Sequence, residues 1–264
     1  MTTASRWFAA ISLALFTLPA RAELVRHWED SFSAAEQARL TGWVTAVHES
    51  VERAVAPFPF DVDLHFHRAY YARSPVPWAN TRRSGRQGVN LHVDPHYSHV
   101  ELMADWTAYH ELAHLYLPYL GRRHSWFAEG FASFLQYPLM KSAGVMTEAE
   151  VQSAYSRKIR TAAAKYDLGD MTFIDAVPVL RARREFPTAY WGGAVYFLNV
   201  DRELRSSGTA LVDVLRQFVT CCRQRRYELD SLVAELDRIA DNDAFSRQLT
   251  EFRTRKGFPD YPTP

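Results

Sequence analysis

The segment His110-Glu111-Leu112-Ala113-His114 constrains this chain more than any other stretch, because its two histidines can act together only on a helix. Residues four apart on an α-helix lie on one face, one turn above the other. His110 and His114 can therefore direct their imidazole rings to one point about 2 Å away, which is a normal zinc–nitrogen distance. Glu111 lies one residue further around the helix, close enough to reach a water molecule at that point. The segment predicts a helix that binds zinc and activates water.

The N-terminus has the form of a secretory signal peptide. Arg6 precedes an uncharged run of 12 residues over positions 7–18, and Ala-Arg-Ala at positions 20–22 has the small-x-small spacing of a cleavage site. An N-terminal anchor helix is the alternative, but a helix needs roughly 20 apolar residues to cross a bilayer, so the length of this run favours a signal peptide. We expect residues 1–22 to be removed, the protein to be exported to the periplasm or the medium, and no stable membrane anchor to remain.

The remaining chain is nearly neutral. The 264 residues carry a formal net charge of +1, and removal of residues 1–22 takes away two arginines and no acid, which leaves about −1. Such a mixed surface gives no reason to expect nucleic acid or anionic lipid as a partner. The two cysteines, Cys221 and Cys222, are adjacent, and a disulfide between neighbours is strained. We expect free buried thiols that do not hold the fold together.

The apolar pattern predicts an α+β fold. Apolar residues recur at three- and four-residue steps from about Ser33 to Val55, which indicates a helix. Polar and apolar residues alternate over 61–67 and 89–93, which indicates strands. The other expected helices run over Val100–Leu117 and Trp126–Leu139 or begin near Thr147, Ala189, Gly208, Glu228 and Asn242. We expect a small N-terminal mixed sheet, a mainly helical C-terminal part, and a zinc site where they meet.

A catalytic zinc site needs a third protein ligand and keeps its fourth position for water. The metzincin pattern would place glycine at position 117 and histidine at 120, but this chain has Leu117 and Leu120, so that class is excluded. His124, in a basic loop after the histidine helix, is a conceivable ligand.

The segment WFAEGFASF, residues 126–134, resembles the third-ligand helix of the gluzincin metallopeptidases, particularly the aminopeptidase N and glycyl-aminopeptidase groups. In those enzymes a similar run supplies the zinc-binding glutamate. The resemblance implies a zincin-like fold and one Zn²⁺ per chain, held by His110, His114 and Glu129, with Glu111 as general base. Ser133 lies four residues after Glu129 on the same helix face, so it either hydrogen-bonds a ligand histidine or packs as an ordinary small residue.

A second segment, TAYWGGAVYFLNVDRELR, resembles the gluzincin segment whose tyrosine stabilises the oxyanion. The resemblance assigns that role to Tyr190, with Gly193 and Ala194 in register, and Tyr196 is the alternative. Gly192 stands where the family has a lysine. Together the similar segments cover roughly residues 88–205.

The sequence also departs from these aminopeptidases. They grip the free amine of the substrate with acidic residues, often on a strand before the histidine helix, whereas the corresponding stretch GVNLHVD has no glutamate. Its alternation suits an edge strand that pairs with an extended peptide. Aminopeptidase and endopeptidase activity therefore both stay open.

We expect a single peptidase domain over residues 23–264, made of 23–97, 98–139 and 140–264. The predicted activity is that of an exported zinc metallopeptidase acting on a peptide or protein. The alternatives are a non-catalytic zinc-containing binding module and a hydrolase of non-peptide amides, because the zinc chemistry of the latter is identical.

Overall fold

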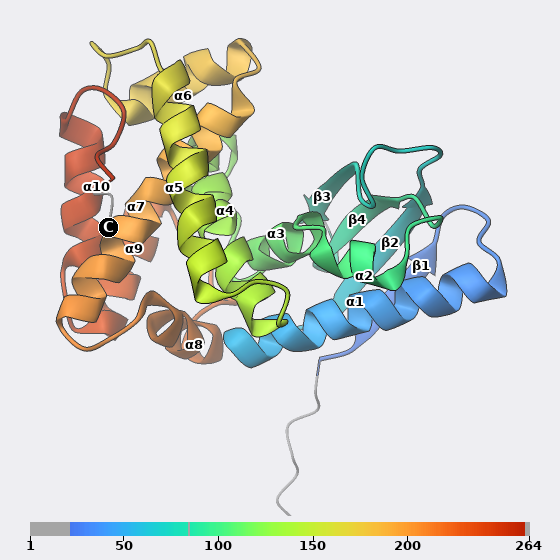
Figure 1. Cartoon of the computed structure of the whole chain (residues 1–264). Coiled ribbons are helices and arrows are strands. Elements are labelled where there is room, and N and C mark those ends of the chain that lie inside the picture. The colour runs from blue at the N-terminus through green and yellow to red at the C-terminus, as the bar shows by residue number, and fades with distance from the viewer. Residues whose placement is uncertain (1–21, 84, 262–264) are drawn as a thin grey trace, which may run out of the picture.

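The structure is a computed structural model that describes residues 22–83 and 85–261, so nearly all of the expected signal peptide lies outside it. The architecture is α+β, as predicted: a small sheet with α1 lies to one side, and most other helices gather on the other (Figure 1). The elements are β1 (Leu24–Trp28), α1 (Ala34–Ala54), β2 (Val62–Arg68), β3 (Trp78–Arg82), β4 (Gly88–Val93), α2 (His99–Ala104), α3 (Thr107–His114), the 3-10 helix η1 (Arg122–His124), α4 (Ser125–Ser142), α5 (Glu148–Lys165), α6 (Phe173–Ala182), α7 (Phe186–Ser206), α8 (Leu211–Cys221), α9 (Leu229–Ala240) and α10 (Ala244–Thr254).

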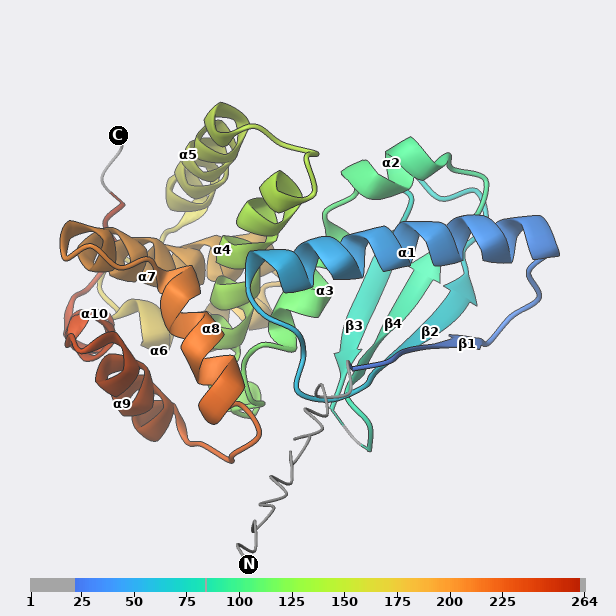
Figure 2. The same ribbon diagram turned by 90° about the horizontal axis from the view of Figure 1, so that it is seen from below.

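The helix α1 confirms the first predicted helix and covers one face of the sheet (Figure 2). Ser33 and Glu36 form a capping box, in which each side chain satisfies a free backbone amide of the first turn. The apolar stripe points inward, because Trp43, Val47 and Val51 are fully buried. The buried apolar residues form a continuous cluster that also extends through the C-terminal helices. Within the described part of the chain, no helix is both long and apolar enough to cross a membrane.

The edge of the sheet differs from the prediction. The strand order is β1-β2-β4-β3; β1, β2 and β4 are parallel, and β3 pairs antiparallel with β4. The stretch GVNLHVD, expected at the edge, thus lies inside the sheet as β4. The edge strand next to β4 is β3, while β1 forms the opposite edge. Sequence patterning missed β3 because its residues are exposed or half-buried and show no apolar alternation. The strand β1 and the helix α6 were also not predicted from the sequence.

The predicted helix Val100–Leu117 is in fact two helices, α2 and α3. The break falls at Asp105, whose backbone is extended (φ −77°, ψ 127°). Its carboxylate accepts a hydrogen bond from the backbone N–H of Thr107, at 2.8 Å, and a longer one from Val76, at 3.4 Å. Aspartate competes in this way with helix continuation, because its side chain replaces the carbonyl that a helix would supply. The histidine motif therefore lies on a short helix that begins just after this aspartate.

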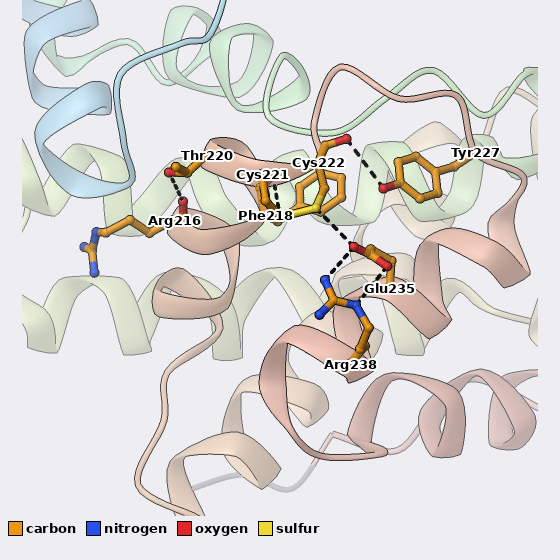
Figure 3. Close-up of a disulfide and its surroundings, with 8 residues drawn as sticks. All are labelled: Arg216, Phe218, Thr220, Cys221, Cys222, Tyr227, Glu235 and Arg238. Carbon is orange, nitrogen blue, oxygen red and sulfur yellow. Dashed lines mark hydrogen bonds and ion pairs between the residues drawn. A yellow bond between two sulfur atoms is a disulfide. The ribbon is translucent and has the colours of Figure 1, made fainter. Parts of the chain in front are cut away.

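The expectation of two free thiols is wrong, because Cys221 and Cys222 form a disulfide with an S–S distance of 2.08 Å (Figure 3). The helix α8 ends at Cys221, and the backbone of Cys222 leaves helical geometry (φ −139°, ψ −19°). This change of direction between the two residues allows neighbouring sulfur atoms to meet. Cys222 Sγ also lies 3.1 Å from a carboxylate oxygen of Glu235 on α9.

The helices α4 and α7 touch through two glycines. A Cβ atom on Gly130 would lie 2.3 Å from the backbone carbonyl carbon of Gly193, and one on Gly193 would lie 2.3 Å from the backbone oxygen of Trp126. No side chain fits between the two backbones. The contact matters for the site, because Glu129 precedes one glycine and Tyr190 lies three residues before the other.

We expect Gly130→Ala to lower the free energy of unfolding by about 1–3 kcal/mol, because overpacking at a rigid backbone contact forces the helices apart. Gly42→Ala is the matched control: this α1 glycine has open space around its Cβ position, and alanine in a helix is favoured by roughly 0.5–1 kcal/mol. Urea unfolding should give opposite signs for the two variants. Equal or stabilising effects would contradict the close approach of α4 and α7.

Candidate metal centre

The helices α3 and α4 bring together the three predicted metal ligands. Glu129 Oε2 lies 3.3 Å from His110 Nε2 and 3.5 Å from His114 Nε2. The three residues form a group whose ligand atoms all lie within 4.8 Å of one another. The two histidines are less than a tenth exposed, and the glutamate is half-buried. The histidines belong to α3 and the glutamate to α4, and α3 lies between the sheet and α4 (Figure 1).

The spacing of these atoms fits a zinc ion. With zinc–nitrogen and zinc–oxygen bonds of about 2.0–2.2 Å, tetrahedral coordination places neighbouring ligand atoms roughly 3.3–3.5 Å apart. The glutamate-to-histidine distances have these values. Among the described residues the group contains three ligands and does not include His124, so a fourth position is left for water or substrate.

A glutamine fixes the orientation of the first histidine. His110 Nδ1 lies 2.9 Å from Gln136 Oε1, so the ring N–H donates to the amide oxygen and leaves Nε2 as the ligand atom. Sequence reasoning missed Gln136, although it follows Glu129 by seven residues and so shares its helix face. Both ring nitrogens of His110 are engaged, so Ser133 could hydrogen-bond only the ring of His114. Its role as the partner of a ligand histidine stays a prediction.

The charges of the group suit metal binding. Burial raises the pKa of the Glu129 carboxyl, but the charges and hydrogen bonds of the two histidines outweigh it and hold this pKa well below its usual range. Burial lowers the pKa of His110, but the hydrogen bond to Glu129 and the neighbouring carboxylates raise it overall. The carboxylate is thus ionised at neutral pH, as a metal ligand must be.

Glu111 lies beside the ligands but is not one of them. Its side chain is buried, at 8% exposure, and Oε2 accepts a hydrogen bond of 2.8 Å from the Thr81 hydroxyl on β3. The edge strand thus holds the carboxylate in place. Thr81 was not predicted, because β3 itself was not recognised in the sequence.

The phenol of Tyr190 also faces this region. Its ring centroid lies 6.4 Å from that of His110, and it lines the same cavity as the three ligands. Burial, with a contribution from Glu129, raises the pKa of Tyr190, so the phenol keeps its proton at neutral pH. Tyr196 is fully buried and donates its hydroxyl to the backbone oxygen of Phe245, 2.8 Å away. Of the two tyrosines, only Tyr190 lines the cavity.

Gly192 lies where two helices pack closely. A Cβ atom on Gly192 would lie 2.2 Å from the Phe173 ring, so α6 fills the space that a side chain would need. The glycine therefore belongs to the packing of α6 on α7 and leaves the neighbouring phenol unaffected.

The cavity around these groups has a volume of about 570 Å³. Its walls come from the edge strand β3, the helix α3, the start of α4, and single residues of α6 and α7. A cavity of this size can hold several residues of an extended peptide.

Comparison with known proteins identifies solved structures with a similar fold. No protein-family model matches the sequence, and no curated protein matches it. Solved structures do match: an M1 zinc metallopeptidase from Deinococcus radiodurans has a TM-score of 0.51 at 14% identity, over 89% of this chain and 47% of that chain. A mutant of an M1 zinc metallopeptidase from Deinococcus radiodurans, bound to a Tyr-Ser-Ala substrate, has a TM-score of 0.54 at 13% identity. This match covers 90% of this chain and 49% of that chain. A mutant of a two-domain M1 zinc metallopeptidase bound to L-tryptophan has a TM-score of 0.53 at 14% identity. This match covers 92% of this chain and 52% of that chain.

The chain thus spans about half the length of the solved structures that it matches. At this level of identity the likeness shows the fold alone, which is that of zinc metallopeptidases. What the fold does in this chain depends on the site.

Proposed function

We propose that this protein is a zinc-dependent metallopeptidase that hydrolyses peptide bonds. The observation that carries the proposal is the group of two histidines and one glutamate, with the glutamate oxygen at tetrahedral spacing from both histidine nitrogens, beside a buried glutamate that is not a ligand. A purely structural zinc is usually closed by four protein ligands and has no need of such a glutamate. The shared fold with zinc metallopeptidases supports the same conclusion.

In the proposed mechanism, His110, His114 and Glu129 hold the metal. When bound there, zinc lowers the pKa of water to about 7 and polarises the scissile carbonyl. Glu111 takes a proton from the attacking water and passes it to the departing amine. Thr81 orients the Glu111 carboxylate for this step through its hydrogen bond.

The phenol of Tyr190 donates a hydrogen bond to the oxyanion that develops at the carbonyl. Its raised pKa keeps it a neutral donor throughout the reaction. The edge strand β3 supplies the remaining element, because Trp78, Ala79, Asn80 and Thr81 line the cavity. We propose that an extended substrate lies along β3, where an edge strand offers unpaired backbone groups.

Export to the periplasm or the medium is a further part of the proposal. It rests on the signal-peptide pattern of residues 1–22 and is supported by the Cys221–Cys222 disulfide, since disulfides persist in oxidising compartments.

The test is to purify residues 23–264, measure zinc content, and incubate the protein with a mixed peptide library. We expect one zinc per chain and hydrolysis that stops when a chelator removes the metal. The positions of the cuts would distinguish exopeptidase from endopeptidase action. Zinc content near zero, or turnover unaffected by full removal of zinc, would contradict the proposal.

Replacing Tyr190 with phenylalanine should lower kcat by about 10²- to 10³-fold, because it removes one donor to the oxyanion. KM should change little, since the donor acts mainly in the transition state. Tyr71→Phe, at a residue that is 92% exposed, is the control and should behave as the wild type. Steady-state kinetics on one peptide would check this, and a Tyr190→Phe effect confined to KM would assign the phenol to substrate binding instead.

A further inference from the structure

The acidic groups of the cavity are all engaged. Three carboxylates line it, and two of them, Glu111 and Glu129, belong to the proposed catalytic machinery. The third, Asp105, is 8% exposed and accepts hydrogen bonds from the backbone amides of Thr107 and Val76. Within residues 22–83 and 85–261, the cavity therefore has no carboxylate left over to bind a substrate amine.

The basic groups of the cavity, unlike the acidic ones, are not all engaged. Arg83 is internal: it donates to the backbone oxygens of His114, at 2.5 Å, and Leu117, at 3.1 Å, and so holds the end of α3. Arg122 and Arg181 also line the cavity, and in the described part of the chain neither forms an ion pair with a carboxylate. Two guanidinium charges thus remain without a counter-charge.

Arg181 lines the same cavity as Tyr190, and the Phe186 ring packs against both of them. It occupies the last turn of α6, and its guanidinium carbon is 6.0 Å from the centre of the Phe186 ring. That ring is in turn 6.3 Å from the ring of Tyr190. Arg122 is exposed and lies on η1, at the start of α4.

The sum of these charges favours an anionic substrate. A zinc ion with two positive charges would be balanced by the carboxylates of Glu111 and Glu129, and the charge of Asp105 would be balanced by that of Arg83. Arg122 and Arg181 would then leave the cavity with net positive charge. A guanidinium also binds a carboxylate with two parallel hydrogen bonds, which gives both affinity and orientation.

We propose that the cavity selects peptides that carry a carboxylate close to the scissile bond, with Arg181 as the group that binds it. The carboxylate belongs either to an acidic side chain or to a free C-terminus. Arg122, at an exposed position, attracts such substrates by its charge. This inference rests on the proposed peptidase function and adds the class of substrate.

The test measures binding separately from cleavage. In a zinc-loaded Glu111→Gln background, we would titrate N-acetylated octapeptides of alanine and leucine that carry one Glu or one Gln at each position in turn. A second series would compare a free C-terminus with a C-terminal amide. We expect about tenfold or tighter binding of the carboxylate form in at least one series, since hydrogen bonds to charged groups are the stronger ones. The series that responds would identify the source of the carboxylate.

The variant Arg181→Gln should abolish this preference. Arg183→Gln is the matched control: it removes the same charge two residues away, from a side chain paired with Asp167 at 2.7 Å outside the cavity. It should retain the preference. Arg181→Glu should reverse it in favour of peptides with lysine at that position, and thermal unfolding would verify that each variant is folded.

Equal binding of the carboxylate and amide forms would overturn the inference, even if wild-type protein cleaves peptides. A preference that survives in folded Arg181→Gln would overturn it as well, because the carboxylate would then be held by a group other than Arg181, either Arg122 or the metal. A preference that depends on Arg181 would support the inference even if no peptide is cleaved, and in that case the proposed peptidase function alone would fail.

Discussion

Replacing Glu111 with glutamine is expected to lower kcat/KM by about 10³-fold or more while one zinc stays bound per chain. General acid–base catalysis contributes roughly 10²–10⁴-fold, and an amide cannot accept the proton of the attacking water. The zinc ligands are unaffected, because Glu111 is not among them. The Thr81 hydroxyl can still donate to the amide oxygen of glutamine, so the local structure should persist.

The measurement is hydrolysis of one peptide identified in the library, alongside zinc content by elemental analysis. Glu49→Gln removes an exposed carboxylate from α1 and serves as the control with the same chemical change. Its activity should equal that of the wild type. Turnover retained in Glu111→Gln would eliminate this residue as the base, and zinc lost from the variant would show that the glutamate supports the metal instead.

The second large effect is expected when the metal is removed and restored. Zinc that binds only the folded state stabilises it by about 4 kcal/mol at a free concentration a thousand times the dissociation constant. For a chain of this size, such a gain raises Tm by roughly 8 °C or more. Calorimetry on chelated protein before and after addition of zinc would measure the shift.

Glu129→Ala should lose most of this zinc-dependent shift, because two histidines alone bind zinc far more weakly than three ligands do. The comparison uses the shift rather than Tm itself, since removing a buried carboxylate also changes the stability of the metal-free protein. His124→Ala is the matched control and should keep the full shift, because His124 lies outside the ligand group. The opposite result, with the shift lost in His124→Ala, would mean a closed site with a fourth protein ligand and would favour a binding module.

The sequence by itself determined the parts of this protein that depend on spacing within one helix. His110 and His114 share a face because four residues nearly complete a helical turn, whatever the helix packs against. The apolar stripe of α1 is local in the same sense and occurs as the pattern predicts, and the capping box of Ser33 and Glu36, which the sequence analysis did not single out, is local as well. The resemblance of residues 126–134 to a family then gave Glu129, which the structure places beside both histidines.

The local sequence pattern also gave two wrong predictions, one for a helix and one for the cysteines. The apolar periodicity of residues 100–117 continues across Asp105, but the carboxylate accepts the backbone N–H of Thr107 and the helix is interrupted there. The adjacent cysteines were expected as free thiols because a disulfide between neighbouring residues is strained. The end of α8 falls between them, and the disulfide forms there.

The tertiary structure alone decided which groups surround the metal ligands. Gln136 and Thr81 reach His110 and Glu111 from α4 and from β3, and neither contact follows from spacing along the chain. The distance between Glu129 and Tyr190 depends on two backbones that meet at glycines, and Arg181 joins the cavity only because α6 packs on α7. Helix geometry fixes positions within an element to a fraction of an ångström, whereas positions between elements are set by packing, which the contributions of many distant residues determine together.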